Sequence, residues 1–230
     1  MNQKLANWIG IELIEVSWKE KLLSTLGGLV AIYLLIELSH WALPEAGAGA
    51  VVASMGASAV LLFAVPHGAL SQPWPVIGGH AVSAIIGVAC ARVLHNPQIA
   101  AALAVGLSIG AMHHFKCIHP PGGATAFTAV MGGESIRSLG FNFVCFPVLV
   151  NASAIVLMAI LINCGFKWRR YPAAFAGAGK QLFKTGYQPP THEQVVEAIR
   201  SLDSFVDITE RDLLRLTESL SIPSQRGARG

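Results

Sequence analysis

Apolar residues fill long uninterrupted runs through the middle of the chain, whereas polar residues gather toward its two ends. A helix that crosses the hydrocarbon core of a bilayer needs about 20 predominantly apolar residues. Four runs meet or nearly meet this length, and they are residues 22–43, 76–94, 98–115 and 139–166. The pattern therefore predicts an all-α polytopic membrane protein with four full transmembrane helices.

Two further apolar segments are too short to cross the bilayer. Residues 51–65 are rich in Gly, Ala and Ser, and residues 124–131 follow a Pro-Pro-Gly-Gly sequence. A helix of about ten residues spans only about half of the hydrocarbon, since each residue adds about 1.5 Å. We therefore expect two half-helices, each preceded by non-helical chain that is buried in protein or lines a cavity.

The two short segments begin alike, with Gly-Ala-Ser-Ala from Gly56 and Gly-Ala-Thr-Ala from Gly123, and a long apolar run precedes and follows each. This order predicts two structural repeats over residues 22–95 and 98–166. Duplicated units with broken helices are typical of transporters, which bind their substrate between the repeats. Six crossings would make the repeats inverted and four would make them parallel, and the loop charges leave both open.

Composition agrees with a membrane protein. The chain is 53% hydrophobic and 13% charged, with a mean hydropathy of +0.55, whereas soluble domains carry about 25% charged residues. From residue 22 to residue 162 the charged residues are Glu37, Glu45, Arg92, Lys116, Glu134 and Arg137. The formal net charge of +3 does not indicate a nucleic-acid partner, so the expected partner of the surface is the lipid bilayer.

The chain ends suggest a division into four parts. We expect an amphipathic segment over residues 1–21, a membrane domain over 22–171, a linker over 172–190 and a small helical hairpin over 191–230. Basic residues flank both ends of the membrane domain, and the positive-inside tendency then places both termini in the cytoplasm, with the domain in the cell membrane. The hairpin could regulate the protein, contact another copy in a homo-oligomer or simply be solvated.

Candidate chemistry concentrates in one polar stretch between two apolar runs. It contains His113, His114, Lys116, Cys117 and His119, and the sequence Pro-Pro-Gly-Gly-Ala-Thr follows. The prolines stop the preceding structure, and the glycines let a ligand approach the backbone closely. A helix that opens at Ala124 would present unpaired N–H groups and a partial positive charge. The stretch therefore predicts a cradle for an anion.

The predicted substrate site draws on both half-helix starts and on two nearby polar side chains. Its members are His119, Gly122, Gly123, Ala124, Thr125, Gly56, Ala57, Ser58, His80 and Lys116. The Gly and Ala positions would offer backbone N–H groups, the two hydroxyls would bind anion oxygens, and His119 would fix the turn or donate a hydrogen bond. Alternatively, each hydroxyl bonds a carbonyl one turn back and is structural.

Other chemistries find less support in the sequence. His113, His114, Cys117 and His119 are metal-ligand types, but closed zinc sites usually draw ligand pairs from separate elements, and Lys116 among them would repel a cation. No paired carboxylate, His-Glu-x-x-His motif or nucleophile elbow is present. We therefore expect neither an enzyme nor a bound cofactor or metal.

Several spaced motifs resemble the HPP family of small membrane proteins. The family triplet matches His119-Pro120-Pro121 within a block that ends at Ala126, and further resemblance lies in residues 54–59, 66–73 and 76–80. The resemblance covers about residues 20–165. It implies four predicted membrane helices and a link to nitrite transport, and the family members fused to cystathionine-β-synthase-type domains have a longer tail than this chain has after Thr191. The sequence thus predicts transport of a small monovalent anion, which the resemblance implies to be nitrite. The alternatives are a membrane-embedded sensor or assembly subunit without transport activity, or a metal-cation transporter.

Overall fold

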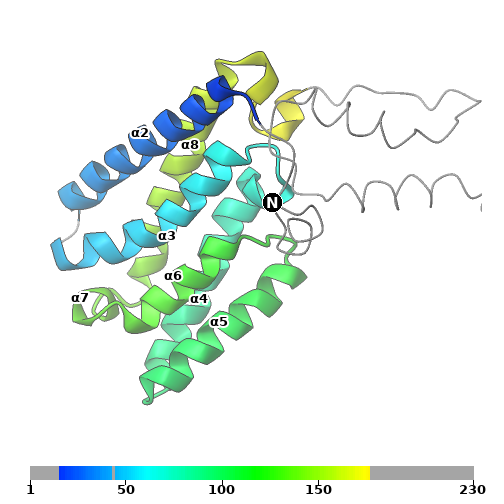
Figure 1. The fold of residues 1–230 in the computed structure, drawn as a ribbon. Helices are drawn as coiled ribbons and strands as arrows, with labels where there is room; N and C mark the ends of the chain where they lie inside the picture. Colours follow the sequence, from blue (N-terminus) through cyan, green and yellow to red (C-terminus); the bar gives the residue numbers. More distant parts are fainter. Residues whose placement is uncertain (1–15, 43–44, 177–230) are drawn as a thin grey trace, which may run out of the picture. The chain divides into compact units, whose positions relative to one another are not determined.

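The computed structural model describes residues 16–42 and 45–176, and every regular element in this part of the chain is helical. The long helices are α2 (Trp18–Ala42), α3 (Glu45–Ala64), α4 (Pro73–Val93), α5 (Pro97–His114), α6 (Pro120–Met131) and α8 (Val150–Cys164) (Figure 1). Shorter elements are η1 (Ala69–Ser71), α7 (Glu134–Arg137), η2 (Val144–Leu149), η3 (Lys167–Arg169) and η4 (Ala173–Ala176). The predicted all-α class is confirmed.

Three helical stretches of the described residues are long and apolar enough to cross a membrane, namely Trp18–His40, Pro73–Val93 and Val144–Cys164. The expected fourth crossing corresponds to α5. It has 18 residues and carries two prominent polar ends, with Gln98 near its start and His113 and His114 at its finish. Its polar ends lower its mean hydropathy below that of the other three.

The first predicted half-helix is wrong in its starting point. Helix α3 begins at Glu45 and has 20 residues, so Gly56 lies inside it rather than at its N-terminal end. Glycine and alanine do not end a helix that packs closely against neighbouring membrane helices. The second half-helix is short as expected, but α6 starts at Pro120 instead of Ala124, because proline suits the first positions of a helix, where its missing N–H has no intrahelical partner. The predicted repeats therefore contain unequal short helices and stay a prediction.

The predicted long helix over residues 139–166 is interrupted. Phe146 has non-helical backbone angles, φ −136° and ψ 121°, and Pro147 follows it within the π-helical segment η2. Proline lacks the N–H that a regular helix needs and its ring crowds the preceding turn. The regular part, α8, consequently begins only at Val150.

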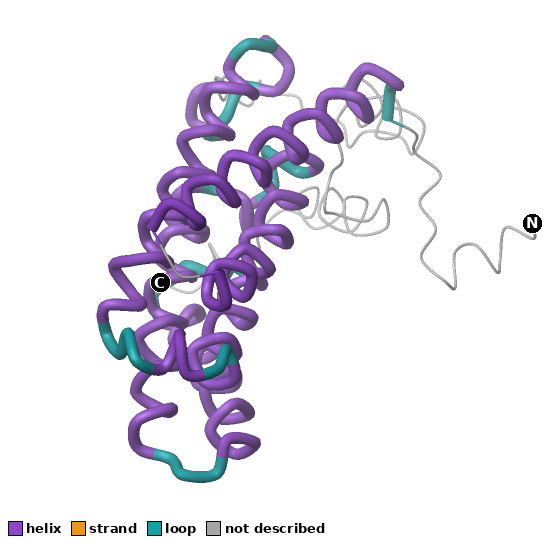
Figure 2. Tube along the Cα trace, turned by 90° about the vertical axis from the view of Figure 1, so that its left-hand side faces the viewer, coloured by secondary structure: helices purple, strands orange, loops and turns teal. Residues whose placement is uncertain are grey.

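Helices α4, α5 and α6 form the closest group in the bundle (Figure 1), and Figure 2 shows the helices of the bundle from the side. A Cβ atom added to Gly79 of α4 would lie 2.7 Å from the His119 Cβ, and one added to Gly87 would lie 2.7 Å from the Ala126 carbonyl oxygen. On the facing helix, a Cβ on Gly122 would lie 2.9 Å from the Gly79 carbonyl oxygen. Residue numbers rise in the same direction along the two facing helices, so α4 and α6 run parallel, with their backbones nearly in contact.

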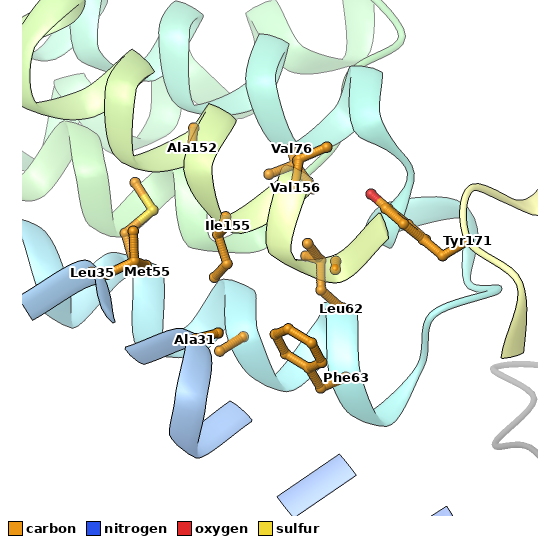
Figure 3. Packing of buried hydrophobic residues seen from close by; sticks show 12 residues of the cluster. Ala31, Leu35, Met55, Leu62, Phe63, Val76, Ala152, Ile155, Val156 and Tyr171 are labelled. Carbon is orange, nitrogen blue, oxygen red and sulfur yellow. The ribbon is translucent and has the colours of Figure 1, made fainter. Parts of the chain in front are cut away.

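A second packing layer joins α2, α3, α4 and α8. Its buried side chains include Leu35, Met55, Phe63, Ile155 and Val156 (Figure 3). The outer faces of the bundle are also apolar, with exposed leucines at positions 26, 29, 103, 107, 157 and 161. So many exposed large apolar side chains indicate that lipid rather than water surrounds the bundle.

Several predicted parts lie outside the described residues. The N-terminal amphipathic segment is described only from residue 16, the linker only to residue 176, and the helical hairpin over 191–230 not at all. The helices that carry the candidate site all belong to one compact unit, Leu22–Gly177.

Candidate functional site

Four buried polar side chains meet where α3, α4 and the start of α6 come together. Ser58 comes from α3, His80 from α4, Thr125 from α6, and His119 is the residue just before α6. Each is at most 1% exposed, and the two imidazole rings lie edge to face with centroids 5.0 Å apart. We refer to these four residues as the histidine–hydroxyl cluster.

The close packing of α4 and α6 places this cluster. Gly79 leaves room for the His119 side chain, and Gly122 leaves room for the Ser83 hydroxyl and the α4 backbone. The loop between α3 and α4 supplies one further partner, because the Leu70 carbonyl oxygen lies 2.8 Å from Nδ1 of His119. The neighbouring Ser71 hydroxyl donates to the Leu61 carbonyl over 3.0 Å and so ties the loop to α3.

The contact with Leu70 fixes the direction of the other hydrogen bonds when both rings are neutral. A carbonyl oxygen only accepts, so Nδ1 of His119 carries the hydrogen and Nε2 accepts from the Ser58 hydroxyl over 2.8 Å. Since Ser58 has one hydrogen, Nε2 of His80 donates to the serine oxygen over 2.9 Å. Nδ1 of His80 then accepts from the Thr125 hydroxyl over 2.7 Å. A single hydrogen-bond chain thus runs from Thr125 to the Leu70 carbonyl.

Each hydroxyl of the cluster also has a second acceptor within reach. The Ser58 oxygen lies 3.3 Å from the Ser54 carbonyl oxygen, and the Thr125 oxygen lies 3.4 Å from the Pro121 carbonyl oxygen. These are the carbonyls one turn back that serve a structural hydroxyl in a helix. Both hydroxyls can therefore turn away from the histidines and still keep a hydrogen bond.

The start of α6 does not offer the backbone donors that the anion cradle requires. Pro120 and Pro121 have no N–H, and the N–H of Gly122 donates to the His119 carbonyl oxygen over 2.8 Å. A helix start normally leaves four N–H groups without intrahelical partners. At the start of α6, the N–H of His119 is the one group of these four that is neither missing nor bonded to His119 itself. An anion would therefore be bound by side chains rather than by a row of backbone N–H groups.

The remaining predicted site residues lie apart from the cluster. Ala57, Ala124 and Lys116 are exposed, and Lys116 has a positive φ of 55° in the turn before α6. Gly56 is half-buried beside a groove between α2 and α3, and Gly123 is half-buried with Val105 as its nearest neighbour. Gly56, Ala57, Gly123 and Ala124 therefore share a sequence pattern with the cluster but do not contribute side chains to it.

The possible metal ligands are separated in the structure. His113 and His114 are exposed, whereas Cys117 and His119 are buried. Among the described residues, no group of three or more His, Cys, Asp or Glu side chains is arranged to hold a metal ion.

A second buried polar group, which we call the Arg169 cluster, was not anticipated from the sequence. The Arg169 side chain is 1% exposed and donates to the Asn163 side-chain oxygen over 3.1 Å, to the Ser24 hydroxyl over 3.2 Å and to the Phe63 carbonyl oxygen over 2.6 Å. The Asn163 amide in turn donates to the Leu62 carbonyl over 3.2 Å. In the sequence this arginine is indistinguishable from the basic residues beside it, which flank a membrane helix.

Comparisons with known proteins identify a family that matches this chain. A model of the transmembrane region of the HPP family matches residues 14–172. Two proteins of Dictyostelium discoideum, each named only as a transmembrane protein, are 38% and 37% identical over 165 residues, which is 70% of this chain and 51% and 56% of theirs. The chain thus spans about half the length of these relatives, and no solved structure matches it. Since the family model covers most of the chain, the protein belongs to the HPP family and is an integral membrane protein.

Proposed function

We propose that this protein moves a small monovalent anion, namely nitrite, across the membrane, and that the histidine–hydroxyl cluster is the site through which the anion passes. The observation that supports this is the cluster itself, in which four polar side chains from three segments meet at full burial inside a membrane bundle. Polar and ionisable side chains are costly inside a membrane and typically mark substrate or ion pathways.

The chemistry of the cluster favours an ion with one charge. Its members are neutral hydroxyls and imidazoles, and none forms an ion pair with an Asp, Glu, Lys or Arg in the described part of the chain. A site without a permanent charge compensates little of the cost of removing phosphate or sulfate from water. A weakly hydrated monovalent anion costs less to desolvate, and nitrite is the member of this class that the family resemblance implies.

The hydroxyls supply a way to exchange internal hydrogen bonds for bonds to an anion. In the described arrangement Ser58 and Thr125 donate to the histidines. Each would redirect its hydrogen to an anion oxygen when helix α3 moves relative to α4 and α6. The site thereby keeps its donors paired when it is empty, and no backbone N–H is needed.

A membrane-embedded sensor or assembly subunit is the second candidate. The close contact of α4 with α6 at Gly79, Gly87 and Gly122 favours it, because a tightly packed seam suits a static subunit better than a pathway. A metal-cation transporter has no described group of three or more ligand side chains to support it.

The deciding experiment is flux into liposomes that contain the purified protein, with nitrite, nitrate and chloride tested separately. Empty liposomes are needed as a control because nitrous acid leaks through lipid. Ser58→Ala and Thr125→Val each remove one hydroxyl with little change in volume. Loss of a hydrogen bond to a charged group corresponds to roughly 1.5–3 kcal/mol, so we expect about a tenfold or larger fall in uptake at low nitrite concentration. Ser153→Ala, at an exposed position of α8, is the matched control and should transport normally.

Two results would count against anion transport. Nitrite flux equal to that of empty liposomes at every pH would remove the nitrite assignment, and transport of a metal cation without any anion would replace it. Normal uptake by both hydroxyl variants would show that Ser58 and Thr125 are structural.

A further inference from the structure

A small cavity of about 60 Å³ lies away from the histidine–hydroxyl cluster, where the C-terminal ends of α4 and α6 meet α7 and the chain that follows it. It is lined by Val88, Ala91, Arg92, Ala129, Ile136, Arg137 and Gly140. Two of the six charged residues between positions 22 and 162 therefore line one cavity, and both are exposed. Both are arginines, whose charge is permanent.

The guanidinium of Arg92 is oriented by its surroundings. Its Cζ lies 5.2 Å from the centroid of the Phe141 ring, which is a cation–π contact. Gly140, with a positive φ of 52°, leaves the space for it, because a Cβ there would overlap a terminal nitrogen of Arg92. A guanidinium that contacts a ring through its face keeps its N–H groups at its edge. No described residue accepts a hydrogen bond from them or pairs with their charge.

Arg137 is oriented by a different contact. Its Nε donates to the Val130 carbonyl oxygen over 3.1 Å, which satisfies a carbonyl at the C-terminal end of α6. The terminal N–H groups of the guanidinium are not used in that bond. Glu134 lies three positions earlier on α7, but no ion pair within 4.0 Å joins it to Arg137 in the described structure.

We propose that Arg92 and Arg137 form a binding site for an oxyanion at this end of the bundle. Two cationic groups that line one cavity repel each other, and an anion bound between them attracts both. A guanidinium binds oxyanions through parallel N–H groups. The partial negative charge at the ends of α4 and α6 opposes anion binding, but the bond from Arg137 already engages one of the carbonyls that carry it.

The oxyanion has two possible sources with the same chemistry, a small soluble ion or the phosphate of a lipid headgroup. The other large contributors to the lining, Val88, Ala91, Ala129 and Ile136, are apolar, and the volume of about 60 Å³ limits the ligand to a small anionic group. The site shares no residue with the histidine–hydroxyl cluster, so the proposal does not depend on the proposed transport.

The test uses the purified full chain in an uncharged detergent after removal of lipid. Thermal unfolding is followed while nitrite, inorganic phosphate or phosphatidylglycerol is titrated, with chloride at equal ionic strength as the reference. We expect saturable stabilisation by at least one of the three. Arg92→Gln and Arg137→Gln should each weaken binding about tenfold or more, since each removes charge-assisted hydrogen bonds. Arg92→Lys keeps the positive charge but loses the parallel N–H groups of the guanidinium, so it should weaken binding less than Arg92→Gln does.

Arg170→Gln is the matched control, because Arg170 is an exposed arginine far along the chain that does not line the cavity. It should bind inorganic phosphate and phosphatidylglycerol as the wild type does. Ser58→Ala should also bind these two probes normally, because Ser58 does not line the cavity. Stabilisation by phosphatidylglycerol alone identifies a lipid phosphate as the ligand. Stabilisation by nitrite or phosphate identifies a soluble ion where Arg92→Gln and Arg137→Gln both weaken it. The proposal is wrong if no probe stabilises the protein more than chloride does, or if the double variant Arg92→Gln/Arg137→Gln binds as the wild type does.

Discussion

The Arg169 cluster and the histidine–hydroxyl cluster are both fully buried in the bundle, but they satisfy their polar atoms in different ways. The first holds a permanent charge, which donates to the Phe63 backbone carbonyl, to the Ser24 hydroxyl and to the Asn163 side chain, which itself donates to a backbone carbonyl. The second carries no permanent charge, and three of its four short bonds join one side chain to another across helices. Backbone carbonyls cannot move without their helices, whereas hydroxyls rotate freely between acceptors.

This difference suggests a structural role for the Arg169 cluster and a functional role for the histidine–hydroxyl cluster. Removing Arg169 would take this donor away from the buried Phe63 carbonyl and Asn163 side-chain oxygen, so we expect its contribution to be one to stability. The hydroxyls of Ser58 and Thr125 keep a second acceptor each, at 3.3 and 3.4 Å. Their removal should change what the site does more than whether the bundle folds.

The largest expected effect is on stability in Arg169→Ala. The change leaves the Asn163 side-chain oxygen and the Phe63 carbonyl oxygen buried without this donor, and each unsatisfied group costs about 1–3 kcal/mol. We expect a fall of about 3 kcal/mol or more in the free energy of unfolding, visible as a lower midpoint of thermal unfolding in detergent. Arg170→Ala should unfold as the wild type does. A midpoint unchanged by Arg169→Ala would remove the distinction between the two clusters.

Gly79→Ala should have the next largest effect. The added Cβ would lie 2.7 Å from the His119 Cβ and 2.9 Å from the Cys117 carbonyl oxygen, so α4 must shift against α6. Overpacking of this kind typically costs about 1–3 kcal/mol, and the shift should also lower transport. Gly56→Ala is the paired control, because nothing lies within 4 Å of its added Cβ, and it should fold and transport normally. Equal behaviour of the two variants would contradict the close contact described for α4 and α6.

The smallest expected effect is on the pH dependence of nitrite binding. A proton on the histidine pair and an anion at the cluster carry opposite charges, so each should favour the binding of the other, by reciprocity. We expect the protein to bind nitrite more strongly at mildly acidic pH. His119→Asn keeps a donor for the Leu70 carbonyl but has no equivalent of the Nε2 that faces Ser58, so its affinity should change less with pH. A wild-type affinity that is constant between pH 5 and pH 8 would argue against proton linkage.

The sequence predicted the helical class and the main members of the cluster. Long apolar runs indicate membrane helices directly, and the repeated Gly-Ala-Ser/Thr-Ala pattern indicated Ser58 and Thr125, which the structure joins through His80. His80 was singled out because it follows two glycines within an apolar run, and His119 because it ends the polar stretch before Pro-Pro-Gly-Gly.

The missed features depend on three-dimensional contacts that composition does not encode. The start of α3 at Glu45 was missed, since a run of small residues fits a close-packed helix and a loop equally well. The break at Phe146 was missed because a single proline within an apolar run often only bends a helix. The partner carbonyl of Leu70 and the buried state of Arg169 could not be inferred, since a backbone carbonyl has no sequence signature and arginine is common at helix ends.

The two prolines that open α6 also bear on how the protein is assembled. A helix that begins inside a membrane protein normally carries backbone N–H groups that must shed water without gaining a partner, which is costly. Pro120 and Pro121 remove two such groups, and Gly122 bonds the His119 carbonyl. The short helix can therefore insert and pack during synthesis with little desolvation penalty, before any ion reaches it. Substituting alanine for both prolines would restore two N–H groups. We expect the cost of desolvating them to appear first as poor membrane insertion and low yield.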